Sequence, residues 1–271
     1  MTRAPRFLLL LALLVVGLNG PARADGDSVM IEDLTWPEIK ARMEAGATTI
    51  IVPTGGTEQN GPHMVLGKHN VIVRYTAAEI ARRLGKTLVA PVLAYVPEGS
   101  WDPPQGHMRF PGSISLPDAV YEGVLESTAR SFAAEGFKTI LFLGDSGPNQ
   151  QPQAAVAQKL DAELKAKGID VFQVGDYYAH NGQEEWLKSQ GFAEAEIGVH
   201  AALIDTAQLM AIDPEGVRMA LLGSSAGNPD GSKNGVIGDP AKATAALGQK
   251  LLELKIEAAV RQIRQKLAPI P

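Results

Sequence analysis

The stretch Thr54-Gly-Gly-Thr-Glu-Gln-Asn-Gly-Pro-His-Met-Val-Leu-Gly-Lys-His-Asn70 decides the fold prediction, because it joins an apolar run to a helical pattern. The run at residues 49–52 is typical of a buried strand, and residues 71–84 show helical spacing of apolar side chains. A loop that leaves the carboxyl end of a central strand is where open α/β sheets place their binding sites. This loop carries Glu58, His63 and His69, so it is the first candidate for metal binding or proton transfer.

Strand-like and helix-like segments alternate along the rest of the chain. The pattern predicts helices at residues 33–45, 117–135, 154–167, 198–211 and 240–267, and further strands at 87–93, 138–143 and 169–174. Such alternation is the signature of a parallel sheet covered by helices on both faces. We therefore predict one α/β domain over residues 25–271, a three-layer sandwich with a mainly parallel central sheet.

Residues 1–24 have the features of a cleavable signal peptide. Arg3 and Arg6 precede an apolar run at residues 7–18, which is too short to span a bilayer, and Ala22-Arg23-Ala24 has the form of a cleavage site. We expect cleavage after Ala24 and export to a periplasm or out of the cell, with no membrane contact after cleavage. An N-terminal membrane anchor is the alternative.

Charge and composition argue against a nucleic-acid partner and limit the residues that could bind a metal. The chain of 271 residues has a formal net charge of −5, and loss of the three arginines of residues 1–24 would make it −8. No cluster of lysine and arginine forms the basic face that nucleic acid binding requires, so we expect no nucleic-acid partner. The chain has no cysteine, so a metal site would have to use histidine, aspartate, glutamate or asparagine.

A second loop follows the strand predicted at residues 138–143 and carries Asp145 and Ser146. If this strand lies beside residues 49–52, the two loops converge, and Asp145 becomes a further metal ligand or a base that activates water. The alternative is that Glu58 caps a turn and the histidines are polar loop residues. A serine nucleophile is disfavoured, because the elbow pattern needs glycine where Pro148 stands.

Six segments stand out in order along the chain: Thr35-Trp-Pro-Glu38, Glu58-Gln-Asn-Gly-Pro-His63 with its continuation to His69, Phe110-Pro-Gly-Ser-Ile-Ser-Leu116, Gly144-Asp-Ser-Gly-Pro-Asn149, His200-Ala-Ala-Leu-Ile-Asp205 and Gly235-Val-Ile-Gly-Asp-Pro240. They resemble segments of the creatininase family of metal-dependent amidohydrolases, and the likeness covers nearly all of residues 25–271. The resemblance implies a creatininase-like fold, hydrolysis of an amide or cyclic amide C–N bond in a small molecule, and a homo-oligomer, which is a hexamer in the family.

The departures from the family pattern fall on its metal ligands. The resemblance places a histidine ligand at Asn60, a bridging aspartate at His69 and a further histidine ligand at Ser146, whereas Glu58 is kept. An imidazole cannot supply the two oxygens of a bridging ligand, so the two-metal mechanism does not carry over directly. The ligand set favours one zinc or manganese ion over two, and a centre without metal stays open.

These observations assign expected roles. Glu58 and His69 are the predicted metal ligands, and Asp145 and His63 are the predicted catalytic residues. The predicted substrate-binding residues are Asn60, His107, Ser146 and His200. The expected function is an exported hydrolase with a remodelled metal site, and the alternative is an exported protein that binds a small molecule without turning it over.

Overall fold

The computed structural model describes residues 28–268, so the predicted signal peptide lies outside the described residues. These residues form a parallel sheet of four strands, β1 (Thr49–Thr54), β2 (Thr87–Val89), β3 (Thr139–Gly144) and β4 (Asp170–Gln173), in the order β2-β1-β3-β4. Strands β1 and β3 pair from Thr49↔Thr139 to Thr54↔Gly144. Their carboxyl ends therefore lie side by side, and the loops that follow them start from neighbouring positions.

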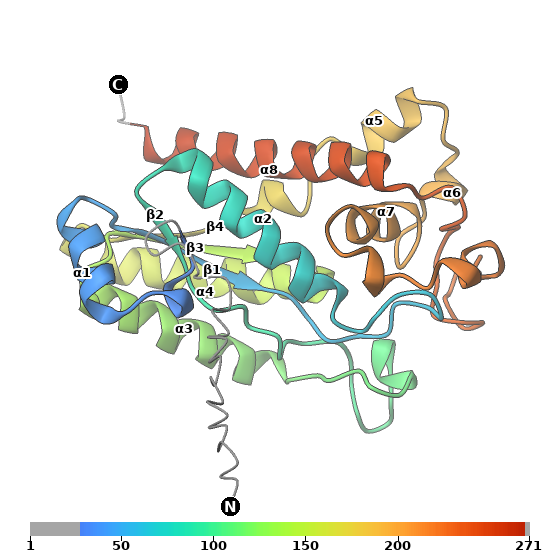
Figure 1. Cartoon of the computed structure of the whole chain (residues 1–271). Helices are drawn as coiled ribbons and strands as arrows, with labels where there is room; N and C mark the ends of the chain where they lie inside the picture. The colour runs from blue at the N-terminus through green and yellow to red at the C-terminus, as the bar shows by residue number, and fades with distance from the viewer. Residues whose placement is uncertain (1–27, 269–271) are drawn as a thin grey trace, which may run out of the picture.

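Helices cover both faces of the sheet (Figure 1). Helices α2 (Lys68–Leu84) and α8 (Ala245–Leu267) lie on one face, and α3 (Asp118–Glu135) and α4 (Gln150–Leu164) lie on the other. Alternate residues of β1 point to opposite faces, so that Ile50 packs with α3 and α4 and Ile51 packs with α2 and α8. The prediction of a three-layer α/β sandwich is confirmed.

Helix α8 is amphipathic and carries one basic residue on its apolar stripe. Leu252, Ile256, Val260 and Ile263 repeat at helical spacing and are buried, which draws the helix onto the sheet. Lys255 falls on the same stripe and is only 6% exposed. A lysine is almost never buried this far unless a negative charge meets it, so its position points to a partner inside the protein.

A third apolar cluster closes the end of the sheet where β1 and β3 terminate. It gathers side chains from α5 (Gln183–Ser189), α6 (Glu194–Ile197) and α7 (Leu203–Ile212) around Leu203, Leu209 and Val236. The remaining helix, α1 (Trp36–Glu44), lies at the other end of the molecule (Figure 1) and starts with the predicted capping box, in which Glu38 accepts hydrogen bonds from Thr35.

Several element boundaries differ from the sequence prediction. Helix α2 starts at Lys68 rather than at residue 71, so Lys68 and His69 belong to its first turn. Helix α7 starts at Leu203 rather than at residue 198, because Gly198 and Ala201 adopt positive φ angles of 65° and 51° that a helix cannot contain.

His200 therefore does not lie on a helix, and it forms an isolated antiparallel bridge with Ile237 instead. Helix α8 starts at Ala245, where the Thr244 side chain accepts a hydrogen bond from Leu247 N, and not after Asp239. Strand β2 stops at Val89 instead of extending to residue 93. Among residues 28–268, the helices include none with the length and apolar character that crossing a membrane requires.

Candidate active site

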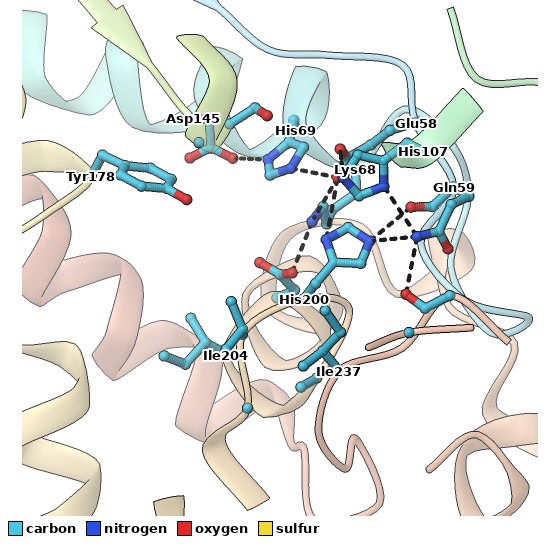
Figure 2. Close-up of a pocket in the computed structure, with 18 of the residues that line it drawn as sticks. Glu58, Gln59, Lys68, His69, His107, Asp145, Tyr178, His200, Ile204 and Ile237 are labelled. Carbon is cyan, nitrogen blue, oxygen red and sulfur yellow. Dashed lines mark hydrogen bonds and ion pairs between the residues drawn. The ribbon is translucent and has the colours of Figure 1, made fainter. Parts of the chain in front are cut away.

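A cavity of about 470 Å³ lies at the carboxyl ends of β1 and β3. Figure 2 shows that its polar side chains come from separate parts of the chain and point toward one another. The polar lining residues include Glu58, Gln59, Lys68, His69, His107, Asp145, Ser146, His200, Asp205 and Lys255. The two strand-end loops converge as predicted, because β1 and β3 are neighbours in the sheet.

His69 links the two loops. From the first turn of α2, its Nε2 lies 2.9 Å from Oε1 of Glu58 and its Nδ1 lies 2.7 Å from Oδ2 of Asp145. A carboxylate only accepts hydrogen bonds, so each ring nitrogen must donate a proton and the ring is an imidazolium. Burial and Lys68 would lower the pKa of His69, but Glu58 and Asp145 outweigh them and raise it.

Asp145 is 2% exposed and is surrounded by donors. Its Oδ1 lies 2.6 Å from the Lys255 Nζ and 2.6 Å from the Tyr177 hydroxyl, and the same ammonium lies 4.4 Å from the centre of the Tyr177 ring. Burial would raise the pKa of Asp145, but Lys255 and His69 hold it below its ordinary value. Asp145 is therefore an ionised carboxylate, and it explains why Lys255 can lie on the buried stripe of α8.

Lys68 is fully buried and pairs with two carboxylates. Its Nζ lies 2.8 Å from Oδ2 of Asp205 and 3.5 Å from Oε1 of Glu58. Asp205 also accepts a hydrogen bond of 2.8 Å from the backbone N–H of Ala201, in the turn that precedes α7. Burial would lower the pKa of Lys68, but Asp205 and then Glu58 raise it, so the amine is charged.

Gln59 fixes how the two other cavity histidines are protonated. Its Oε1 accepts from Gly61 N at 3.0 Å and its Nε2 donates to the carbonyl of Gly235 at 3.0 Å, so its amide cannot be reversed. The amide nitrogen also lies 3.1 Å from Nδ1 of His107 and 3.0 Å from Nε2 of His200. One amide hydrogen is left for these two, and it goes to Nδ1 of His107, because Nε2 of His200 donates to the Gln59 carbonyl. Because His107 is neutral when Nδ1 accepts, its proton is on Nε2, which lies 3.1 Å from Oε2 of Glu58.

His200 has one ring nitrogen without a close partner. Its Nε2 lies 2.9 Å from the carbonyl oxygen of Gln59, which can only accept, so Nε2 carries the proton even though the Gln59 amide nitrogen lies 3.0 Å from it. Its Nδ1 lies 3.6 Å from Oε1 of Glu58, too far for a hydrogen bond. Burial, followed by the charge of Lys68, lowers the pKa of His200 to about 4. At neutral pH His200 thus presents an unprotonated Nδ1 to the cavity, which can accept a proton.

Glu98 is a second buried carboxyl beside Glu58. It is 1% exposed, and neither of its oxygens meets a partner in good hydrogen-bond geometry among the described residues, although Glu58 and Ser146 lie close enough to act on its pKa. Burial, and then the negative charge of Glu58, raises the pKa of Glu98 to about 11. The carboxyl is therefore protonated and neutral. Gly56 is required opposite it, because a Cβ at that position would lie 2.2 Å from Oε1 of Glu98.

Two of the predicted site residues do not line the cavity. Asn60 is fully buried and its Nδ2 donates to the backbone carbonyls of Glu58 and Val65 at 3.0 Å, so it stabilises the loop. His63 is also fully buried, and its Nε2 lies 2.9 Å from the Thr206 hydroxyl. The structure places the predicted substrate-binding side chain of Asn60 and the predicted catalytic side chain of His63 in the packed interior instead.

The other predicted residues all line the cavity, in partly different arrangements. Glu58, His107 and His200 form the group of possible metal ligands found among residues 28–268, with ligand atoms within 4.8 Å of one another. His69 is not in this group, and both of its nitrogens contact carboxylates. Sequence reasoning missed Lys68, Lys255, Gln59 and Glu98. The one usable signal was Lys255, a basic residue on an otherwise apolar helical stripe.

Comparison with known proteins identifies the relatives of this chain. The sequence model of the creatininase family, described as creatinine amidohydrolase, matches residues 32–263. Creatinine amidohydrolase of Pseudomonas putida is 28% identical over 196 residues, which are 69% of this chain and 73% of the relative. The mycofactocin precursor peptide peptidase of Mycolicibacterium smegmatis is 29% identical over 222 residues, which are 80% of this chain and 84% of the relative.

Solved structures share the fold. A crystal structure of creatinine amidohydrolase aligns with a TM-score of 0.74 and 24% identity, over 90% of this chain and all of the other. Two further creatininase structures with the same fold are described by their metals, one as a manganese form and one as a Zn–Zn type.

Proposed function

This chain belongs to the creatininase family, and we propose that it is a hydrolase that cleaves a C–N bond of a small polar molecule in the cavity beside Glu58. The observation that carries the proposal is the unprotonated Nδ1 of His200, which faces the cavity next to the buried cations. A neutral imidazole can act as general base for the attack of water on an amide carbonyl, and with a pKa of about 4 it is unprotonated, though weakly basic, at neutral pH.

The proposed reaction uses side chains that line the cavity. Nδ1 of His200 takes a proton from water while the water oxygen bonds to the carbonyl carbon. The ammonium of Lys68 faces the negative charge that develops on the carbonyl oxygen. His200 then gives its proton to the leaving nitrogen, and the C–N bond breaks. A metal ion has no part in these steps, because His69, Lys68 and His107 already contact both oxygens of Glu58.

The cavity indicates the class of substrate. Its volume of about 470 Å³ suits a small molecule. One side presents Ile204 and Ile237, whereas the opposite side presents the charged cluster (Figure 2). We propose an amide or cyclic amide that carries a short apolar part. The names of the relatives, an amidohydrolase of creatinine and a peptidase, agree with a C–N bond as the target.

Export and assembly are further parts of the proposal. The arginines and the apolar run of residues 1–24 support export to a periplasm or out of the cell. N-terminal sequencing of the protein recovered from that compartment would test it, and an intact Met1 would contradict it. Family membership supports a homo-oligomer, which light scattering on the purified protein would test.

A second candidate function is binding without turnover. The observation that favours it is the saturation of the centre, in which Glu58 and Asp145 each contact three or more donors. Carboxylates engaged in this way are poor bases. An exported binding protein on a creatininase scaffold would keep the cavity and lose the reaction.

A substrate screen separates the two candidates. We would incubate the protein with cyclic and linear amides and measure amine release and, in parallel, ligand-induced shifts in melting temperature. The variant His200→Asn tests the base, and His180→Asn is the matched control, since His180 is exposed and outside the cavity. Turnover lost only in His200→Asn supports hydrolysis, equal turnover in both contradicts this role, and shifts without turnover favour binding.

A further inference from the structure

We infer that three cations of the protein itself, Lys68, His69 and Lys255, take the place of divalent metal ions in this centre. The inference concerns how the buried carboxylates are neutralised, and it holds whether the cavity hydrolyses its ligand or only binds it. It rests on the number of buried charges, on the direction of the hydrogen bonds and on the lack of a free ligand set.

The charges within the cluster balance. Three carboxylates, Glu58, Asp145 and Asp205, meet three cations at hydrogen-bond distance. His69 lies 2.9 Å from Glu58, Lys255 lies 2.6 Å from Asp145, and Lys68 lies 2.8 Å from Asp205. His69 also lies 2.7 Å from Asp145, so the three pairs join into one network. A dication added to this neutral, buried network would bring two charges that nothing in it balances.

The oxygens that a metal would use are already occupied. Oε1 of Glu58 faces His69 and Lys68, and Oε2 faces the Nε2–H of His107. On Asp145, Oδ1 accepts from Tyr177 and Lys255, and Oδ2 accepts from His69. A metal ion binds lone pairs, and these lone pairs already point at protons.

The group Glu58, His107 and His200 meets the spacing of a metal site but not its chemistry. The Gln59 amide donates to Nδ1 of His107, which leaves the ring proton on the Nε2 that faces Glu58. The His107 nitrogen that faces Glu58 is therefore a donor, and both Glu58 oxygens already meet donors, so Nδ1 of His200 is the one free lone pair of this group. One free ligand is too few for a resident zinc or manganese ion.

Glu98 is the one carboxyl of the centre that no cation meets among the described residues. It faces Glu58 from a buried position, so a metal ion between the two would be the rival explanation for its placement. The two explanations differ in an observable way. A metal there would be bound at one ion per chain and lost when Glu58 is neutralised, whereas our inference expects no bound ion in either protein.

Metal analysis of untagged full-length protein tests the inference directly. We expect less than one tenth of an ion per chain by mass spectrometry, both after purification without chelator and after incubation with Mn²⁺ or Zn²⁺ followed by desalting. The melting temperature should be the same with either ion and with EDTA. One or more ions per chain in the wild type, absent from Glu58→Gln, would overturn the inference. Trace metal at equal levels in both proteins counts as adventitious and supports it.

Removing one of these ammonium groups tests whether they take the place of a metal ion. Lys68→Met and, at the other end of the network, Lys255→Met each leave a buried carboxylate without its cation. Mn²⁺ should then raise the melting temperature of at least one variant by several degrees, while the wild type and Lys159→Met do not respond. Lys159 is the matched control, because its Nζ lies 2.8 Å from Glu126, the length of the Lys68–Asp205 pair, but it is 53% exposed. If neither variant responds to Mn²⁺ more than the wild type does, the replacement of metal ions by these cations is refuted. If neither variant folds, the metal content of the wild type decides the question.

Discussion

The variant Lys68→Met should destabilise the protein far more than an equivalent change at the surface. The Lys68 side chain is fully buried and lies 2.8 Å from Asp205 and 3.5 Å from Glu58. Breaking a buried ion pair by removing one partner costs about 3–5 kcal/mol, because a buried charge is left without compensation. Asp205 keeps 23% of its side chain exposed and the hydrogen bond from Ala201, so we expect about 3 kcal/mol, the lower end of that range.

This loss is large on the scale of protein stability. The free energy of unfolding of a typical domain is about 5–15 kcal/mol, and for a chain of this size a loss of about 3 kcal/mol lowers the melting temperature by about 6–12 °C. Methionine keeps most of the buried volume of lysine, so the difference reports mainly the charge. The measurement is urea unfolding followed by circular dichroism, in EDTA, with wild type, Lys68→Met and the exposed control Lys159→Met.

Two results would refute this reasoning. One is a stability of Lys68→Met equal to that of Lys159→Met, which would mean that the Lys68 charge is not neutralised where the structure places it. The other concerns the double variant Lys68→Met/Asp205→Asn, which removes the unpaired carboxylate and keeps an acceptor for the Ala201 N–H. It should recover part of the loss, and a further loss instead would contradict the ion-pair explanation.

Three further predictions concern protons. Glu98 has a pKa of about 11 in the folded protein, above its ordinary 4.5, so its contribution to stability should fall as pH rises above 4.5. Glu98→Gln should remove this fall, which is up to about 5 kcal/mol at pH 8, in chemical unfolding. Burial lowers the pKa of His63 from 6.5 to about 4, so stability should fall by up to about 3 kcal/mol as pH drops through that interval, and His63→Gln should flatten the curve. If His200 is the base, its pKa of about 4 should set the acid limb of kcat/KM, and an acid limb near pH 6.5 would exclude it.

The sequence predicted the layers and the convergence of the two strand-end loops because these depend on local patterns. The apolar runs of β1 and β3 identified central strands, and the polar loops after them had to meet once the strands were neighbours. The start of α7 was wrong by several residues, because helical spacing does not reveal the positive φ angle of Ala201.

The pairing inside the site could not be predicted from local patterns. Lys68 and Asp205 are 137 residues apart, and Lys255 and Asp145 are 110 residues apart. The residue types of the loop therefore suggested a metal-binding loop. In the structure, both ring nitrogens of His69 contact carboxylates instead. Spacing likewise could not show that His63 points into the interior while His107, a lone histidine in a long loop, reaches Glu58.

The position of Lys255 affects the order in which the parts of the protein can fold. Asp145 directly follows the carboxyl end of the central strand β3, whereas the ammonium that neutralises it comes from α8, 110 residues later in the chain. During synthesis, β1, β3 and their loops exist long before that helix does, and Asp145 then has to remain hydrated. The face of β3 that α8 covers can therefore be fully buried only when α8 docks, so that the docking of this helix closes that core and completes the charged cluster of the candidate site in a single event.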